Sequence, residues 1–242
     1  MASIQVPMVS AKFYTQPLLN AGLAAVNDVI KTYGKTIETI SRLTGVIEEV
    51  IYSFIWVESG GDRWATTGRF GRPLSNFVGL MQIDASASIT AIFLANKMGL
   101  LTPDLSKYLV GFLGQKTLDC ILTMKNQSLP NCRPLITQKQ LIDSPELNIL
   151  CGSIYIMVLS KRYIENGTIR LDKVIVAYNR GINVESRVFP MQNLSPEQVY
   201  SQVLKSNMTT QNAKITQVYI SKIVGPSGML TALINPQKLS YA

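Results

Sequence analysis

The chain of 242 residues contains no histidine and only three cysteines. Without imidazole, Ser-His-Asp and Cys-His catalysis are excluded, and so is any zinc site with a histidine ligand. Cys120, Cys132 and Cys151 form no C-x-x-C pair and are too few for an all-cysteine zinc site. Cys120 and Cys132 could pair in an oxidising compartment, but three buried thiols are the simpler expectation. No nucleotide-binding or calcium-binding loop is found either, so we expect no cofactor and no metal.

Long apolar runs and clusters of like charge are also scarce. No stretch reaches the roughly 18 consecutive apolar residues of a membrane span. The N-terminal segment lacks the basic and apolar regions of a secretory signal. The net charge of +8 suits an anionic partner such as a nucleic acid or a bacterial envelope, but Lys and Arg are scattered, with no run of three or more. We therefore expect no nucleic-acid partner and no membrane span.

Apolar residues at spacings of three and four predict a mainly α protein. The first expected helix, of about 20 residues, contains Gly34, which permits a kink or close packing; its apolar stripe is Leu23, Val26, Ile30, Tyr33, Ile37 and Ile40. A second helix should run from about 45 to 58 and end at the glycines that follow. Further helices are expected at 84–98, 105–125, 146–165, 171–179, 196–206 and 212–224. Alternating strand patterns are few, so any sheet should be small.

Three regions are expected along the chain. Residues 1–44 form an irregular arm, up to residue 19, followed by the first helix. Residues 45–224 form the main helical domain, and residues 225–242, which contain two glycines and two prolines, form an irregular tail. The first helix either packs on its own domain or docks onto a partner protein, and the spacing does not decide between the two.

Glu58 stands out because it shares a helix face with apolar residues. It falls four residues after Phe54 and seven after Ile51, and it lies at the negative, C-terminal end of its helix. Burial and the helix dipole both disfavour a charged carboxylate, so we expect a raised pKa, as a general acid needs. The alternative is a glutamate that reaches solvent at a frayed helix end.

The residues around Glu58 resemble the signature of the soluble lytic transglycosylases, which have a goose-type lysozyme-like fold. Five segments follow in the family's order over residues 46–224: Glu58-Ser59 with Ala65; Gly79-Leu80-Met81-Gln82-Ile83; Pro145-Glu146-Leu147-Asn148-Ile149 with Gly152 and Tyr155; Ala177-Tyr178-Asn179-Arg180-Gly181; and Thr216 with Tyr219 and Ile220. The resemblance implies a mainly α, lysozyme-like helical domain with little or no sheet, to which the N-terminal helix and the C-terminal tail are added.

Three departures from the family pattern are visible. The interval from Glu58 to Gly79 is longer than usual, and the extra segment, residues 68–77, contains Arg69 and Arg72. The interval from Gln82 to Asn148 is long as well. Position 215 is isoleucine where the family commonly has glutamate, which affects local hydrogen bonding in the last helix.

The resemblance implies cleavage of the β-1,4 bond between N-acetylmuramic acid and N-acetylglucosamine in peptidoglycan, with a 1,6-anhydro product. Glu58 would be the catalytic acid and base. Ser59, Gln82 and Asn179 would bind sugar groups, although Ser59 could serve only a local turn. Tyr178 and Tyr219 would bond to Glu58 or line the groove, or be core residues. Arg180 would meet substrate carboxylates or be merely exposed.

Two other functions stay open. A lysozyme-type hydrolase would need a second acid, for which Asp62 and Asp84 are candidates, although neither matches a family catalytic position. A structural tail or baseplate component with a degenerate lysozyme-like domain is the other. The missing export signal favours a bacteriophage virion protein, docked to the tail through residues 1–44 and 225–242 and acting in the host periplasm. Arrival in the bacterial periplasm by a non-classical route is the alternative.

Overall fold

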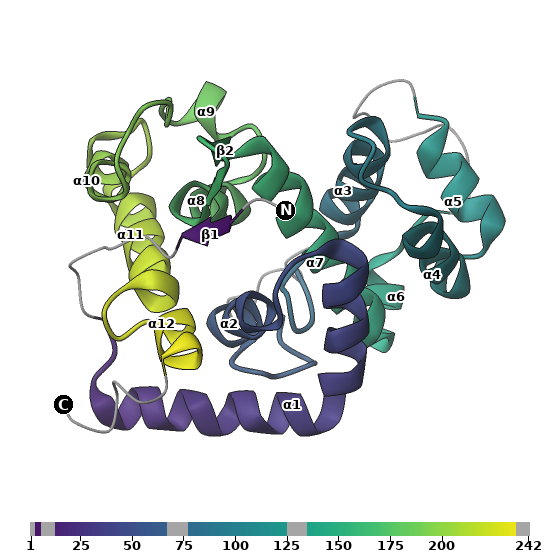
Figure 1. Cartoon of the computed structure of the whole chain (residues 1–242), viewed down its shortest axis with the longest axis horizontal. Coiled ribbons are helices and arrows are strands. Elements are labelled where there is room, and N and C mark those ends of the chain that lie inside the picture. The colour runs from purple at the N-terminus through teal and green to yellow at the C-terminus, as the bar shows by residue number, and fades with distance from the viewer. Residues whose placement is uncertain (1–2, 6–12, 67–76, 125–134, 236–242) are drawn as a thin grey trace, which may run out of the picture. The chain divides into compact units, whose positions relative to one another are not determined.

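The computed structural model describes residues 3–5, 13–66, 77–124 and 135–235. The described chain divides into a central unit, Val26–Val158, and a terminal unit, Met1–Ala25 with Leu159–Ala242. The insertion with Arg69 and Arg72, together with Cys132, lies outside the described residues. The elements are α1 (Gln16–Thr44), α2 (Glu48–Ser59), α3 (Ala85–Lys97), α4 (Pro103–Leu113), α5 (Gln115–Leu122), α6 (Gln138–Asp143), α7 (Pro145–Arg162), α8 (Leu171–Arg180), α9 (Val184–Arg187), α10 (Pro196–Lys205), α11 (Thr210–Val224) and α12 (Met229–Ile234), with strands β1 (Ser3–Gln5), β2 (Ile164–Glu165) and β3 (Thr168–Arg170) (Figure 1).

The predicted mainly α fold with little sheet is confirmed, and most of the expected helices begin and end close to the expected residues. Helix α1 is longer than the expected 20 or so residues: it has 29 and begins at Gln16, inside the expected arm. Three further differences are visible. The expected helix 105–125 is split into α4 and α5, because Gly114 takes a positive φ of 74° at the junction. The tail expected to be irregular contains α12, whose Met229 and Leu230 are fully buried. Residues 3–5 of the expected irregular arm form strand β1.

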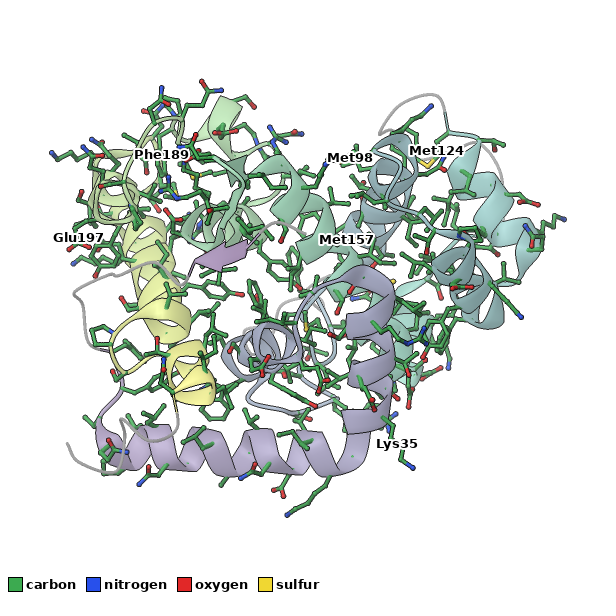
Figure 2. The ribbon with its side chains drawn as sticks, viewed as in Figure 1. Lys35, Met98, Met124, Met157, Phe189 and Glu197 are labelled. Carbon is green, nitrogen blue, oxygen red and sulfur yellow. The ribbon has the colours of Figure 1, made fainter. Side chains whose placement is uncertain are left out.

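Helix α1 changes direction near Gly34, where a kink was predicted. Figure 1 shows the bend, and Figure 2 places Lys35 at the corner. Close packing does not require the glycine, because a Cβ at position 34 would lie at ordinary contact distance, 3.8 Å, from the Tyr52 hydroxyl of α2. The apolar stripe of α1 is largely buried within the chain itself: Leu19, Val26, Val29, Tyr33, Ile37 and Ile40. Ile30, by contrast, is 40% exposed.

In the central unit, α5 packs against both α3 and α4 (Figure 1). Cys120 of α5 is disulfide-bonded, which corrects the expectation of three buried thiols. Cys151 of α7 is a free thiol without solvent exposure, and burial raises its pKa to about 12. The oxidised Cys120 is typical of proteins outside the reducing cytoplasm.

The terminal unit combines a small sheet with the packed helices α8 to α12. The strand order is β1-β3-β2, with β1 parallel and β2 antiparallel to β3. Asn166 and Gly167 join β2 to β3 with φ values of 50° and 75°, the left-handed pair that a type I′ hairpin turn requires. Helix α11 packs against α8, α10 and α12.

A cluster of four charged residues stabilises the start of α8. Lys173 is fully buried and bonds to Glu165, and Asp172 is fully buried and pairs with Arg170 at 2.8 Å. Arg170 also pairs with Glu165 at 2.6 Å. Burial alone would raise the pKa of Glu165, but the hydrogen bond and charge of Lys173, with Arg170, lower it below its ordinary value. The cluster contains two positive and two negative groups and is therefore neutral.

We expect Glu165→Gln to lower the free energy of unfolding by about 3 kcal/mol at neutral pH, because it leaves Lys173 buried without its carboxylate. The lowered pKa of Glu165 also predicts acid sensitivity. The wild type should lose this stabilisation as the pH falls from 4.5 through the folded-state value, and the variant should not show that loss. Urea denaturation from pH 3 to 7 measures both effects. Unchanged stability at neutral pH would contradict the assigned role of the pair.

Candidate active site

Glu58 lies in the last turn of α2, a helix whose preceding turns are buried. Phe54 and Ile51, one and two turns earlier, have no solvent exposure, whereas Glu58 itself is half-buried. Helix α2 ends at Gly60, which has φ of 66° and donates its amide to the carbonyl of Trp56 at 2.9 Å. This left-handed ending is open to glycine at little cost. The carboxylate is therefore carried by a rigid helix at its boundary with solvent.

Ser59 is engaged in the same helix end. Its hydroxyl donates to the carbonyl of Ile55 at 2.9 Å and accepts from the amide of Gly61 at 3.2 Å. These are the local turn bonds that were the alternative to sugar binding. A contact between Ser59 and substrate stays a prediction.

Gln82 connects the segment after Glu58 to the turn that precedes α3. Its side-chain amide donates to the carbonyls of Ala65 at 2.7 Å and Gly79 at 2.9 Å, so both protons are used. The Gly79 amide also donates to Ala65, at 2.9 Å. Gln82 is 5% exposed, has φ of 42°, and its Oε1 has no hydrogen-bond partner among the described residues. Because this oxygen can only accept a hydrogen bond, a ligand that binds to it must supply an N–H or O–H donor.

Helix α7 holds this turn through Asn148 and Gly152, which lie one helical turn apart on one face. The fully buried Asn148 side chain donates to the carbonyl of Val78 and accepts from the amide of Met81, each at 2.8 Å. At Gly152 the Met81 side chain approaches so closely that an added Cβ would lie 2.7 Å from the Met81 Cβ. The two residues form a notch into which the turn fits. Asn148 thus bonds within the fold, as the hydrogen bonds to Val78 and Met81 show.

We expect Gly152→Ala to destabilise the chain by about 1–3 kcal/mol, because the new methyl group overlaps Met81 in a packed interior. Gly111→Ala on α4 is the matched control, since a Cβ there meets nothing within 4 Å. The control should be neutral or stabilise by up to about 1 kcal/mol through helix propensity. Thermal and urea unfolding of both variants measures the difference, and equal effects would contradict the notch.

Asn179, Arg180 and Thr216 form a hydrogen-bonded chain in the terminal unit. The Arg180 Nε donates to the Thr216 hydroxyl, and that hydroxyl lies 3.0 Å from the Asn179 Oδ1. The Thr216 hydroxyl also lies 3.1 Å from the carbonyl of Asn212, which accepts from Arg180 at 2.6 Å. Its single proton can be donated to either acceptor, and the contact with Asn179 is the shorter of the two. When the Asn179 Oδ1 accepts this bond, the two N–H groups of the Asn179 amide are left for other partners.

The two tyrosines of the predicted site also belong to the terminal unit. Tyr219 is 6% exposed and faces the interior from α11, whereas Tyr178 is half-buried. Tyr219 is therefore as buried as expected if it is a core residue, which was the alternative to sugar binding. Sugar contacts for both tyrosines stay predictions.

The predicted site residues thus fall into two groups. Glu58, Ser59 and Gln82 belong to the central unit, where hydrogen bonds join the segment after Glu58 to Gln82. The terminal unit holds Tyr178, Asn179 and Tyr219. Within the described ranges, no group of three or more His, Cys, Asp or Glu side chains is placed to hold a metal ion. No helix in the part of the chain that the structure describes is long and apolar enough to cross a membrane.

Trp64 is a candidate that the sequence interpretation missed. It lies six residues after Glu58, its side chain is 60% exposed, and the Arg63 guanidinium covers its ring at 4.5 Å. Its amide donates to Asp62 at 2.9 Å, which fixes the backbone. The sequence did contain a signal for this residue, a tryptophan in a polar loop shortly after Glu58. Such a tryptophan indicates sugar binding, because exposed aromatic rings provide flat surfaces for sugars.

Comparison with known proteins gives one similarity of note. No protein-family model matches the chain. The chain is 25% identical over 195 residues to the membrane-bound lytic murein transglycosylase E of Buchnera aphidicola subsp. Acyrthosiphon pisum (strain APS), a match that covers 80% of this chain and 70% of that protein. This similarity supports, at the level of the family, the resemblance to lytic transglycosylases.

Proposed function

We propose that the chain is a peptidoglycan lytic transglycosylase in which Glu58 is the general acid and base. The observation that carries this is the arrangement in the central unit. A half-buried carboxylate ends a buried helix, and the next segment is tied by Ala65 to Gln82, which keeps one acceptor oxygen unused. The similarity to a protein named as a lytic murein transglycosylase gives independent support for the reaction.

The proposed reaction needs one carboxyl group that works twice. Protonated Glu58 gives its proton to the glycosidic oxygen while the bond from that oxygen to C1 of N-acetylmuramic acid breaks. The resulting carboxylate then takes the proton of the C6 hydroxyl, whose oxygen forms a bond to C1. The products are a 1,6-anhydro sugar end and a free N-acetylglucosamine hydroxyl. No water is consumed, and Glu58 regains its proton.

The polarity of the neighbouring groups suits an acetylated sugar. Gln82 offers a buried acceptor oxygen, which fits an N–H or O–H of the substrate. Asn179 offers two N–H donors held by Thr216, which fit a carbonyl or hydroxyl oxygen. Trp64 offers an exposed ring face. Each of these groups is proposed to bind the glycan strand.

Each candidate second acid accepts one backbone hydrogen bond through one of its two carboxylate oxygens. Asp62 accepts from the amide of Trp64, and Asp84 caps α3 by accepting from Ala87 at 2.5 Å. A hydrolase of the lysozyme type needs a second carboxylate to activate water or to stabilise the sugar cation. These bonds give both residues a local structural role, and variants of the two test whether either also acts in catalysis.

We expect Glu58→Gln to lower peptidoglycan cleavage by at least about 1,000-fold, because the amide cannot supply or take the proton. Mass spectrometry of fragments released by the wild type should show 1,6-anhydro ends. Reducing ends would indicate the hydrolase instead. Equally poor cleavage by wild type and variant, with both folded, would favour the structural component.

Asp62→Asn and Asp84→Asn should each retain cleavage within about threefold of the wild type. Asparagine keeps the acceptor oxygen of the turn and of the helix cap, so the fold is preserved. Turnover of glycan strands by the two variants, beside Glu58→Gln, measures this. A loss of about 100-fold or more in either variant would assign it as a second acid and contradict the single-carboxylate mechanism.

Delivery to the substrate is a separate proposal. We propose that a phage tail or baseplate carries the enzyme into the host periplasm and that it docks through residues 1–44 and 225–242, parts of which lie outside the described residues. Leu18 and Ile30 of α1 and Ile234 of α12 are exposed apolar side chains in these segments and support docking. Detection of the protein in purified particles tests this placement.

A further inference from the structure

We propose that Arg180 and Arg187 form a carboxylate-binding pair beside Asn179, which recognises the acidic groups attached to the muramic acid of the glycan strand. This inference rests on the proposed function, because it names the part of that substrate that the terminal unit recognises. It adds a charge requirement to the binding of the neutral sugar groups.

Positive charge is concentrated in the terminal unit. Its sequence contains eleven Lys or Arg and four Asp or Glu, so it carries +7 of the chain's net +8. Three of its four acids pair with cations inside the unit: Glu165 and Asp172 in the cluster at α8, and Glu185 with Arg162 at 3.7 Å. The remaining cations have little negative charge to balance them. This composition favours an anionic partner for the unit.

Arg180 is a half-buried cation without an acid. Its Nε and Nη2 bond to neutral oxygens of Thr216 and Asn212, and helix α11, which supplies both, contains no acidic residue. Burial lowers the pKa of the Arg180 guanidinium below its ordinary value, since no carboxylate offsets the lost hydration. Its Nη1 makes no hydrogen bond among the described residues. One edge of the guanidinium is thus held in place, and donors remain for a ligand.

Arg187 brings a second guanidinium to the same turn. Its Nη2 lies 3.4 Å from the carbonyl of Arg180, and a Cβ at Gly181 would lie 2.9 Å from it. Gly181, with φ of 92°, allows this close approach. Arg187 is exposed and has no ion pair in the described structure. The negative end of the α8 dipole favours cations at this place, but it neutralises only about half a charge.

The ligand chemistry follows from these donors. Two planar guanidinium groups with free N–H donors bind a carboxylate well, because N–H···O⁻ bonds to charged acceptors are about twice as strong as neutral ones. The N–H groups of Asn179 lie on the residue next to Arg180 and fit a carbonyl or hydroxyl oxygen of the same sugar. In peptidoglycan, carboxylates occur on the stem peptide and, where the peptide has been removed, on the lactyl group.

The test measures binding in the Glu58→Gln background, so that it does not depend on cleavage. Three probes are compared: N-acetylglucosamine oligomers without carboxylates, glycan strands stripped of peptide, and peptide-bearing strands. Arg187→Gln is added as the test variant. Lys205→Gln is the matched control, because Lys205 is an exposed cation of the same unit on α10. Arg187 is exposed, so its replacement should not unfold the chain.

We expect Arg187→Gln to weaken binding of a carboxylate-bearing strand by about 10-fold and binding of the neutral oligomers by less than twofold. Weakening of peptide-bearing strands alone would assign the stem-peptide carboxylates, and weakening of stripped strands would assign the lactyl group. Lys205→Gln should change none of these affinities more than twofold. Equal weakening for all three probes, no weakening for any, or the same effect in the control would overturn the proposal. The loss of cleavage expected for Glu58→Gln does not depend on this binding result. The proposed function and the proposed carboxylate-binding pair are therefore tested independently.

Discussion

The arrangement of the central unit depends on the hydrogen bonds of one buried amide, Asn148. A single side chain satisfies the carbonyl of Val78 and the amide of Met81 from a position with no solvent exposure. Unmet, these two backbone groups would each carry a desolvation cost of about 1–3 kcal/mol. The turn that they enclose holds Gln82, and Gln82 in turn holds the carbonyl of Ala65 beyond Glu58. The segment that follows Glu58 is therefore placed by a series of contacts that begins on α7.

The long helices could be predicted because their apolar spacing was regular. The helix that carries Glu58 was expected at about 45–58 and lies at Glu48–Ser59, and the helix expected at 196–206 lies at Pro196–Lys205. The split at Gly114 could not be foreseen from spacing, since both halves keep apolar residues in helical register. The Asn166-Gly167 dipeptide was a readable hairpin signal that we did not use.

The site was predictable in residue identity and much less so in geometry. The motif segments identified Gln82 and Asn179, but only the folded structure shows which of their side-chain atoms already make hydrogen bonds within the protein. Gln82 keeps an acceptor and Asn179 keeps donors, although both are carboxamides with the same chemical groups. The difference arises from neighbours distant in sequence, Ala65 in one case and Thr216 in the other. Local sequence contains no information about such pairings.

The single proton of the Thr216 hydroxyl influences which atoms of the Asn179 carboxamide act as donors and which as acceptors. When this proton is donated to the Asn179 Oδ1, the Asn179 carboxamide keeps its two N–H groups for a ligand. In this orientation the Asn179 side chain presents N–H donors, which bind an oxygen atom of a ligand rather than a ligand N–H or O–H. The buried hydroxyl of Thr216 on α11 thereby influences which hydrogen-bonding groups of a ligand can be bound near the C-terminal end of α8.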